Sequence, residues 1–223
     1  NLSLYLSRYM FRIPGLFLMP RKTDSEQSKA KAKAAKSSLR NLKRQFGKRM
    51  VETLLKSPTL IDDIDKIRAA GVRIRLVDGP CRAYYDRKKR TIYIGRWCPR
   101  NYKLISIAHE FVHALVKPTL DPIPGKTGRQ EFINRCLEEE TEAIVHEIEI
   151  VKELIKAGTP VDPKELEWLK RYRRGGRKAI RKALEKTITS TTGEDYPEYY
   201  GSWYDEIVPP AQRIPPPQKH SEI

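Results

Sequence analysis

The hydrophobic pattern of this chain changes its period twice, and this change limits the fold class more than any other feature. Up to Ala70 apolar residues recur every three to four positions, as on one face of a helix. Residues 72–78 (VRIRLVD) then alternate, as in a half-buried strand. CRAYYD and TIYIG flank a charged tip at residues 87–90 and predict a hairpin. Because the helical period returns after residue 100, the order predicts an α+β fold with a small antiparallel sheet among helices.

Capping and breaking residues bound the expected helices. Gly71 is expected just past the end of a helix, and Asn101 is expected as an N-cap. Gly175 and Gly176 are expected to interrupt the last helix. The sequence therefore predicts helices over residues 39–56, 60–70, 102–117, 130–157 and 163–188.

The formal charge of +16 belongs to two segments of the chain. Residues 21–49 carry a net charge of +9 and residues 164–186 carry +7, so the rest of the chain is neutral. Such segments attract nucleic acid or an acidic partner, although solvated helix faces explain them equally well. We expect an N-terminal arm and linker over residues 1–38. A domain over 39–190, with its core at 72–157 and a basic helix at 163–188, and a tail over 191–223 would follow.

The cysteines and the apolar runs bear on the compartment. Cys81, Cys98 and Cys136 form no C-x-x-C pair, which argues against a zinc knuckle or a dense disulfide framework. One disulfide is compatible with the spacing, but reduced thiols in a cytoplasm-like compartment are the simpler interpretation. No uncharged run reaches 18 residues, so we expect no transmembrane helix. The first twenty residues lack the features of a signal peptide. Export, or injection as an effector, stays open.

Residues 107–116, IAHEFVHALV, carry the chemistry of the chain. On a helix, His109 and His113 project from one face, within reach of one ion, and imidazole is a good zinc ligand. Burying two imidazoles and a carboxylate among apolar residues without partners costs several kcal/mol, on the order of 2–7 for each group. A metal removes that cost. The motif predicts a site for one zinc ion, with Glu110 as the general base toward a metal-activated water.

A catalytic zinc needs a third protein ligand, and the helix at 130–157 offers many carboxylates. At about 100° per residue, Glu140 falls at the centre of the apolar face and Glu139 at its edge. Glu147 shares that face two turns later. We therefore expect Glu140 as the ligand, with Glu147 and Glu139 as alternative ligands or as partners of a ligand histidine. His146 is expected on the solvated side, as are Glu138, Glu142 and Glu149.

HEFVH followed by the E-x-x-A of residues 140–143 resembles the gluzincin type of zincin metallopeptidases. It is similar to compact metallopeptidase domains of bacteria and phages, some of them carried by toxins, and more distantly to the ImmA/IrrE-like peptidases. The resemblance covers about residues 72–155. It implies a zincin-like fold with the hairpin packed on the motif helix and on a second long helix. It also implies a zinc-dependent endopeptidase acting on proteins or peptides, with Glu140 as a ligand.

The chain departs from the resemblance at one position, and the resemblance implies one further role. Many relatives have Asp or Asn four residues after the ligand glutamate, where this chain has Ile144. In zincins an edge strand beside the motif helix pairs with the extended substrate. That role would fall to the residues of TIYIG: Thr91, Ile92, Tyr93, Ile94 and Gly95.

Two other functions fit parts of the sequence. A SprT-like protease, which degrades proteins crosslinked to DNA, also combines HExxH and a following Ala with basic flanks. However, such proteases take a third histidine from the next loop, and residues 114–135 contain none. A zincin-derived module that binds nucleic acid or protein without catalysis has no use for Glu110.

Residues 193–217 reverse the charge and are rich in tyrosine. The simpler interpretation is a strap that packs on the domain, followed by a polyproline segment. Alternatively the strap covers the basic surface or the cleft and gates access. In that case Tyr199, Tyr200 or Tyr204 would donate a hydrogen bond to the oxyanion.

Overall fold

The computed structural model describes residues 40–116, 119–189 and 192–215, which belong to one compact unit. The expectations for the N-terminal arm and for the end of the tail lie outside these residues. The fold is α+β, as predicted, and begins with a helical segment at residues 40–46. In chain order the elements that follow are α2 (Lys48–Leu54), α3 (Pro58–Ala69), β1 (Arg73–Val77), β2 (Ala83–Asp86), β3 (Thr91–Gly95), α4 (Arg100–Phe111), the π-helical turn η1 (Val112–Val116), α5 (Arg129–Lys156), α6 (Pro163–Leu184), α7 (Tyr196–Ile207) and the 3₁₀ turn η2 (Pro210–Gln212).

Local signals account for several helix ends. Ser57 caps α3 by accepting a hydrogen bond from the Leu60 amide, and Gly71 follows the helix with a φ of 70°. The single helix expected over 39–56 is interrupted at Gly47, whose φ is 84°. Asn101 is not an N-cap: α4 begins after Pro99, and the Asn101 side chain donates to the carbonyl of Pro160 instead.

The sheet is mixed, so the expectation of an antiparallel sheet is only partly right. Its order is β1-β3-β2, with β2 antiparallel and β1 parallel to β3. The strand TIYIG is therefore central and cannot be the edge that pairs with a substrate. The expectation failed because the hairpin pattern reveals one neighbour of β3, whereas nothing local signals its parallel partner. Among the described residues, β2 forms the sheet edge beside α4 and pairs with β3 alone.

A disulfide between Cys81 and Cys98 joins the loops that precede β2 and follow β3. Cys136 is free and buried. The expectation of three reduced thiols is therefore wrong, because the fold brings these two loops together. The approach is close: a Cβ on Gly95 would lie 2.0 Å from the carbonyl oxygen of Pro80.

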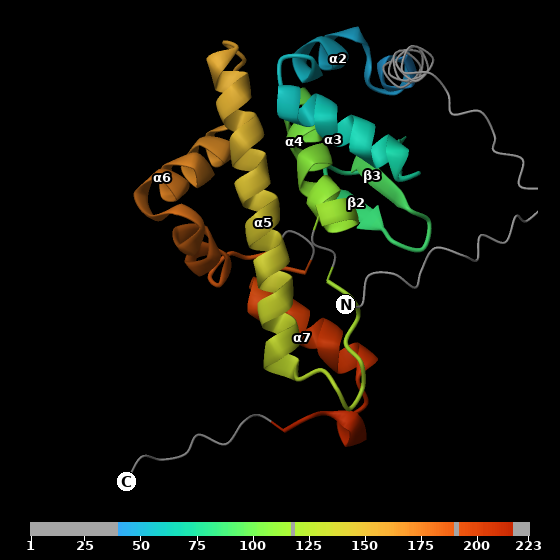
Figure 1. Cartoon of the computed structure of the whole chain (residues 1–223), viewed down its shortest axis with the longest axis vertical. Helices are drawn as coiled ribbons and strands as arrows, with labels where there is room; N and C mark the ends of the chain where they lie inside the picture. The colour runs from blue at the N-terminus through green and yellow to red at the C-terminus, as the bar shows by residue number, and fades with distance from the viewer. Residues whose placement is uncertain (1–39, 117–118, 190–191, 216–223) are drawn as a thin grey trace, which may run out of the picture. The chain divides into compact units, whose positions relative to one another are not determined.

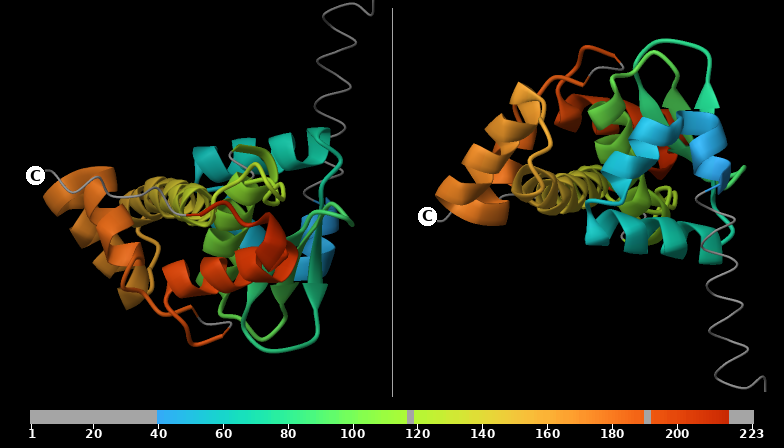
Figure 2. Two further views of the ribbon diagram at one scale, coloured as in Figure 1. Left: turned by 90° about the horizontal axis from the view of Figure 1, so that it is seen from below. Right: turned by 90° about the horizontal axis from the view of Figure 1, so that it is seen from above.

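The long helix α5 lies between two groups of elements (Figure 1). Viewed end-on, it has α6 on one side and α4 with the sheet on the other (Figure 2). One apolar core joins α2, α3, α4 and the sheet to α5 through Ala143, Ile150 and Leu154. A second core joins another face of α5 to α6 and α7. Because α5 contributes to both cores, its position relative to α4 is fixed from two sides.

The C-terminal elements differ in part from expectation. Gly175 and Gly176 have non-helical backbone angles inside α6, as predicted. Much of the expected strap is the helix α7, which Asp195 caps by accepting from the Glu198 amide. It packs across one end of α5 (Figure 1). In the part of the chain that the structure describes, no helix is long and apolar enough to cross a membrane.

Candidate metal centre

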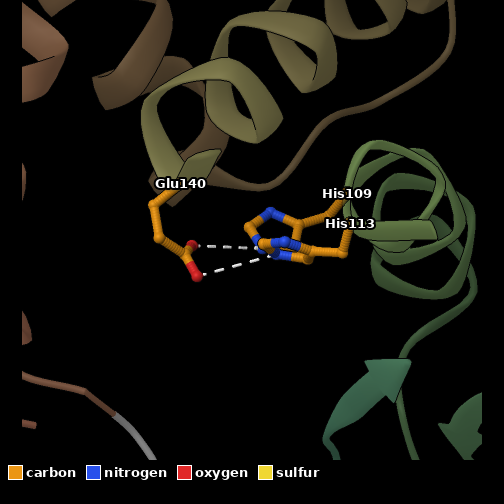
Figure 3. Close-up of side chains that lie close together, drawn as sticks. All are labelled: His109, His113 and Glu140. Carbon is orange, nitrogen blue, oxygen red and sulfur yellow. Dashed lines mark ion pairs between the residues drawn. The ribbon is translucent and has the colours of Figure 1, made fainter. Parts of the chain in front are cut away.

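Two imidazoles project from the end of the motif helix toward α5 (Figure 3). His109 lies in the last turn of α4, and His113 lies in the π-helical turn that continues it. The apolar residues around them, including Ile107, Ala108 and Val112, are fully buried in the core. The packing of the motif helix therefore determines which way both histidines face.

Glu140 of α5 faces both imidazoles. Its Oε2 lies 3.4 Å from Nε2 of His109, and its Oε1 lies 3.6 Å from Nε2 of His113. One ligand atom from each of the three residues lies within 4.8 Å of the others. Among the described residues, no group hydrogen-bonds to the buried Oε2 of Glu140. An acceptor without a donor, opposite two imidazole nitrogens, fits a cation between them. These three residues, called the metal group below, could therefore hold a metal ion.

The other ring nitrogen of each histidine contacts a second carboxylate. Nδ1 of His109 lies 2.8 Å from Glu147, and Nδ1 of His113 lies 2.5 Å from Glu139. The second oxygen of Glu139 accepts from the backbone amide of Thr119. An imidazole that donates from Nδ1 keeps the Nε2 lone pair for a metal. Glu139 and Glu147 are therefore placed as partners of the histidines and not as a third ligand.

The three tyrosines expected at the oxyanion have different positions. The Tyr200 hydroxyl donates to Oε1 of Glu140 at 2.5 Å. The fully buried Tyr204 donates to the Thr127 carbonyl, away from the metal group. Tyr199 lines the cavity beside the group. The expectation is wrong for Tyr204, whereas Tyr200 holds the carboxylate that faces the imidazoles. Successive turns of α7 contact α5 and the loop before it.

Burial and charge act in opposite directions on the pKa values of His109, His113 and Glu140. Burial disfavours the protonated form of His109, but Glu147 and Glu140 outweigh it and raise its pKa well above the usual value. The pKa of His113 is raised in the same way by Glu140 and Glu139. Burial alone would raise the pKa of Glu140, yet the two imidazoles and Tyr200 lower it to about 2. Without a metal, the neighbouring carboxylates therefore favour the protonated form of both imidazoles.

Glu110 lies beside the group and is buried in the cavity wall. Burial raises its pKa, and the imidazoles of His113 and His109 oppose that change. The backbone amide of Tyr85, on the β2 edge, also lowers the pKa of Glu110. The carboxylate is therefore located between the metal group and the free edge of the sheet.

A cavity of about 390 Å³ surrounds these residues, and three of its members were not found from the sequence. Tyr196 begins α7, while Glu165 and Trp168 lie on the first turns of α6. Burial, and after it the carboxylates of Glu140 and Glu147, raise the pKa of Tyr196, so its hydroxyl stays protonated. Nothing in the sequence of α6 or α7 signals this placement, because it depends on how both helices pack on α5.

His146 is not on the solvated side of α5. Its Nε2 lies 2.7 Å from the buried Asp63 of α3, and its ring stacks on Phe111. The expectation was wrong because α3 covers the side of α5 that the helical angle left open. The acidic residues Glu138 and Glu142 are partly exposed and pair with Arg177 of α6.

Comparison of the chain with protein-family models, with curated proteins and with solved structures gave no match.

Proposed function

We propose that this protein is a zinc-dependent endopeptidase. The observation that carries the proposal is the juxtaposition of His109, His113 and Glu140 with a further buried carboxylate, Glu110, in one cavity. Two imidazoles and one carboxylate form the ligand set of many catalytic zinc sites, which leave one position for water or substrate. The buried Oε2 of Glu140, which lacks a hydrogen bond, supports a cation at this point.

The residues of the chain would divide the chemistry among them. Bound zinc would supply a Lewis acid that lowers the pKa of water and polarises the scissile carbonyl. Glu110 would accept a proton from the attacking water and deliver it to the leaving amine. Glu147 and Glu139 would hold the two imidazoles in the tautomer that presents Nε2. The protonated Tyr196 would donate a hydrogen bond to the developing oxyanion.

The substrate would bind along the β2 edge. An extended peptide that adds to this edge lies next to Glu110, because the Tyr85 amide already faces that carboxylate. This assigns to Ala83–Asp86 the role that the sequence had suggested for TIYIG. The resemblance to gluzincins supports the same arrangement, with strand and motif helix side by side.

The test separates metal binding from hydrolysis. Metal content by mass spectrometry should be about one zinc per chain in the wild type and in Glu110→Gln. Hydrolysis of unstructured casein should be lost in Glu110→Gln by about 10²–10⁴-fold. His113→Ala should lose both metal and hydrolysis. Hydrolysis that persists in metal-loaded Glu110→Gln would contradict the role of this carboxylate. A metal-loaded wild type that cleaves neither casein nor a peptide library would favour the non-catalytic module.

The basic face of α6 supports a second property, the binding of an anionic partner such as nucleic acid. Arg173, Arg174, Lys178 and Lys182 are among its exposed basic residues. Phosphate contacts weaken steeply as salt rises. Fluorescence anisotropy with a short duplex DNA should show affinity that falls between 50 and 200 mM salt, by roughly tenfold or more if several phosphates are contacted. Replacing these four residues by Gln should remove that affinity and the salt dependence. Absence of DNA binding at low salt would exclude the SprT-like alternative.

A further inference from the structure

Glu165 is a buried carboxylate in the cavity that the proposed chemistry leaves unused. It lies in the first turn of α6, is 6 % exposed, and lines the same cavity as His109 and Glu140. A glutamate at this helix position often bonds back to the N-cap amide. In the described structure no such bond forms, and the helix start is capped by the Asp162 side chain, which accepts from the Lys164 amide. Within the described part of the chain, Glu165 has neither a hydrogen-bond donor nor an ion-pair partner.

The charged groups around Glu165 supply too little positive charge to favour its ionised form. Burial, and after it Glu147, raise its pKa to about 8, while the nearby Lys164 and His109 act in the opposite direction but do not compensate. A buried carboxyl of this kind stays neutral near pH 7 unless a positive group enters the cavity. The first turn of α6 also favours a negative charge. Glu165 would therefore ionise when a cation from a bound partner enters the cavity.

Aromatic side chains line the same cavity. Trp168 follows Glu165 by one helical turn, Tyr196 comes from α7, and Tyr102 comes from α4. Aromatic faces attract ammonium and guanidinium groups, and they cover the apolar stems of lysine and arginine. The carboxylate and three rings come from three different helices, which makes this a cavity feature and not a property of α6 alone.

We propose that Glu165 and the surrounding rings form a subsite for a basic side chain, arginine or lysine, next to the scissile bond of the substrate. This inference rests on the proposed peptidase function, because it places the subsite in the cavity that contains the metal group. It deepens that function by naming the substrate class: proteins cleaved beside a basic residue. Asp162, Lys164 and Glu147 remain as neighbours of the subsite, whereas the guest cation pairs with Glu165.

Binding is measured first, so that the result does not depend on hydrolysis. The probe is a position-scanning library of N-acetylated decapeptides, in which arginine is fixed at each position in turn. In the matched library citrulline, its neutral isostere, replaces arginine. Binding to zinc-loaded full-length Glu110→Gln is measured by competition against a labelled library member. We expect arginine at one position to bind about 10-fold or more tightly than citrulline, as expected for charge-assisted hydrogen bonds.

Adding Glu165→Gln to Glu110→Gln should remove the arginine preference. The matched control is Glu167→Gln, two residues away, where an exposed glutamate pairs with Arg171. This control should keep the preference. If Glu165→Gln weakened both libraries equally, Glu165 would have a structural role and the inference would fail. Since a misfolded variant could mimic that result, Glu165→Asp serves as a second variant and should retain a reduced preference for arginine.

The remaining outcomes separate the inference from the proposed function. Equal binding of arginine and citrulline at every position overturns the subsite, even if the wild type hydrolyses both libraries. Tight binding that requires a free N-terminal amine in non-acetylated peptides also overturns it, because the guest would then be an α-amino group. An arginine preference in binding without hydrolysis by the wild type supports the subsite and refutes the peptidase. Lysine-fixed peptides show which of the two basic side chains fits better.

Discussion

The hydroxyl of Tyr200 lies 2.5 Å from Oε1 of Glu140, so the C-terminal helix holds the carboxylate that faces both histidines. Glu140 of α5 is buried, and its other oxygen, Oε2, faces Nε2 of His109. The hydrogen bond from Tyr200 to Oε1 therefore fixes the direction in which Oε2 of the same carboxylate points. The position of a carboxylate in the middle of the chain therefore depends on a residue 60 positions later.

Tyr200→Phe tests this dependence. Removing the hydroxyl should lower zinc affinity by about 10-fold or more, as loss of a partner of a metal ligand usually does. It should also cost about 1–3 kcal/mol in the free energy of unfolding, because a buried acceptor loses its donor. Chelator competition and urea denaturation measure the two effects. Tyr204→Phe is the control: it removes a buried hydrogen bond to Thr127 and should change stability but not zinc affinity. Equal losses of affinity in both variants would mean that α7 acts only through its packing.

Glu139 and Glu147 should differ from Glu140 in degree. Glu140→Gln removes a ligand and should abolish stoichiometric zinc binding. Glu139→Gln and Glu147→Gln each remove the acceptor of one imidazole and should lower zinc affinity by about 10–100-fold. Glu149→Gln, an exposed change on the same helix, should have no effect. Zinc titration with a chromophoric chelator distinguishes the classes. Retention of zinc in Glu140→Ala together with its loss in Glu147→Ala would reverse the ligand assignment.

The stability of the metal-free protein should pass through a maximum below neutral pH. The pKa values of His109 and His113 are raised in the folded state, so their contribution is complete below about pH 6.5 and is lost as pH rises through the folded values. The pKa of Glu140 is lowered to about 2, so its contribution is present above about pH 4.5 and is lost as pH falls toward that value. Thermal melts in EDTA should show the highest midpoint between these limits.

Bound zinc should change how the stability of the protein depends on pH. A metal competes with protons for the imidazoles, so its stabilisation should grow as pH rises from about 6 to 8. At a zinc concentration of 1,000 times Kd, the gain is about 4 kcal/mol. Melts with and without zinc across this range measure the difference. A zinc effect that is independent of pH would indicate ligands other than the two histidines.

The disulfide should contribute measurably to stability. Cys81 and Cys98 are 17 residues apart, and closing a loop of that length contributes about 3 kcal/mol in the chain-entropy model. A reducing agent should therefore lower the urea midpoint of the wild type. The double variant Cys81→Ser, Cys98→Ser should have the lower midpoint already and should not respond to reduction. An accessible-thiol count of one after denaturation without reductant would establish the bond, whereas a count of three would contradict it.

The site residues on single helices follow from local geometry. A spacing of four places His109 and His113 on one face, and the helical angle selects Glu140 from a run of acidic residues. In the structure these three side chains form the metal-capable group. Such an inference needs only the helix period and the position of the apolar stripe, both of which are visible in the sequence.

The parts that depend on tertiary pairing were not predictable in this way. The alternation in TIYIG indicates a strand but not whether that strand is central or at an edge, and β3 is central. His146 was misplaced because its partner Asp63 comes from α3, whose position over α5 has no local signal. Tyr196 and Glu165 enter the cavity through the packing of α6 and α7. Such residues are found only when the whole arrangement of helices is known.

The proposed ligands come from two separate parts of the chain, the motif helix with its π-helical turn and α5, and this sets the order in which they are made. The two imidazoles are made first, and the carboxylates of Glu139, Glu140 and Glu147 are made only after the loop at residues 119–128. A nascent chain that ends before α5 has both imidazoles but none of these three carboxylates. Capture of a metal ion by this set would therefore wait until α5 has packed on α4, and Tyr200 is made later still. Metal loading in this protein would be a late event that reports the completion of the fold.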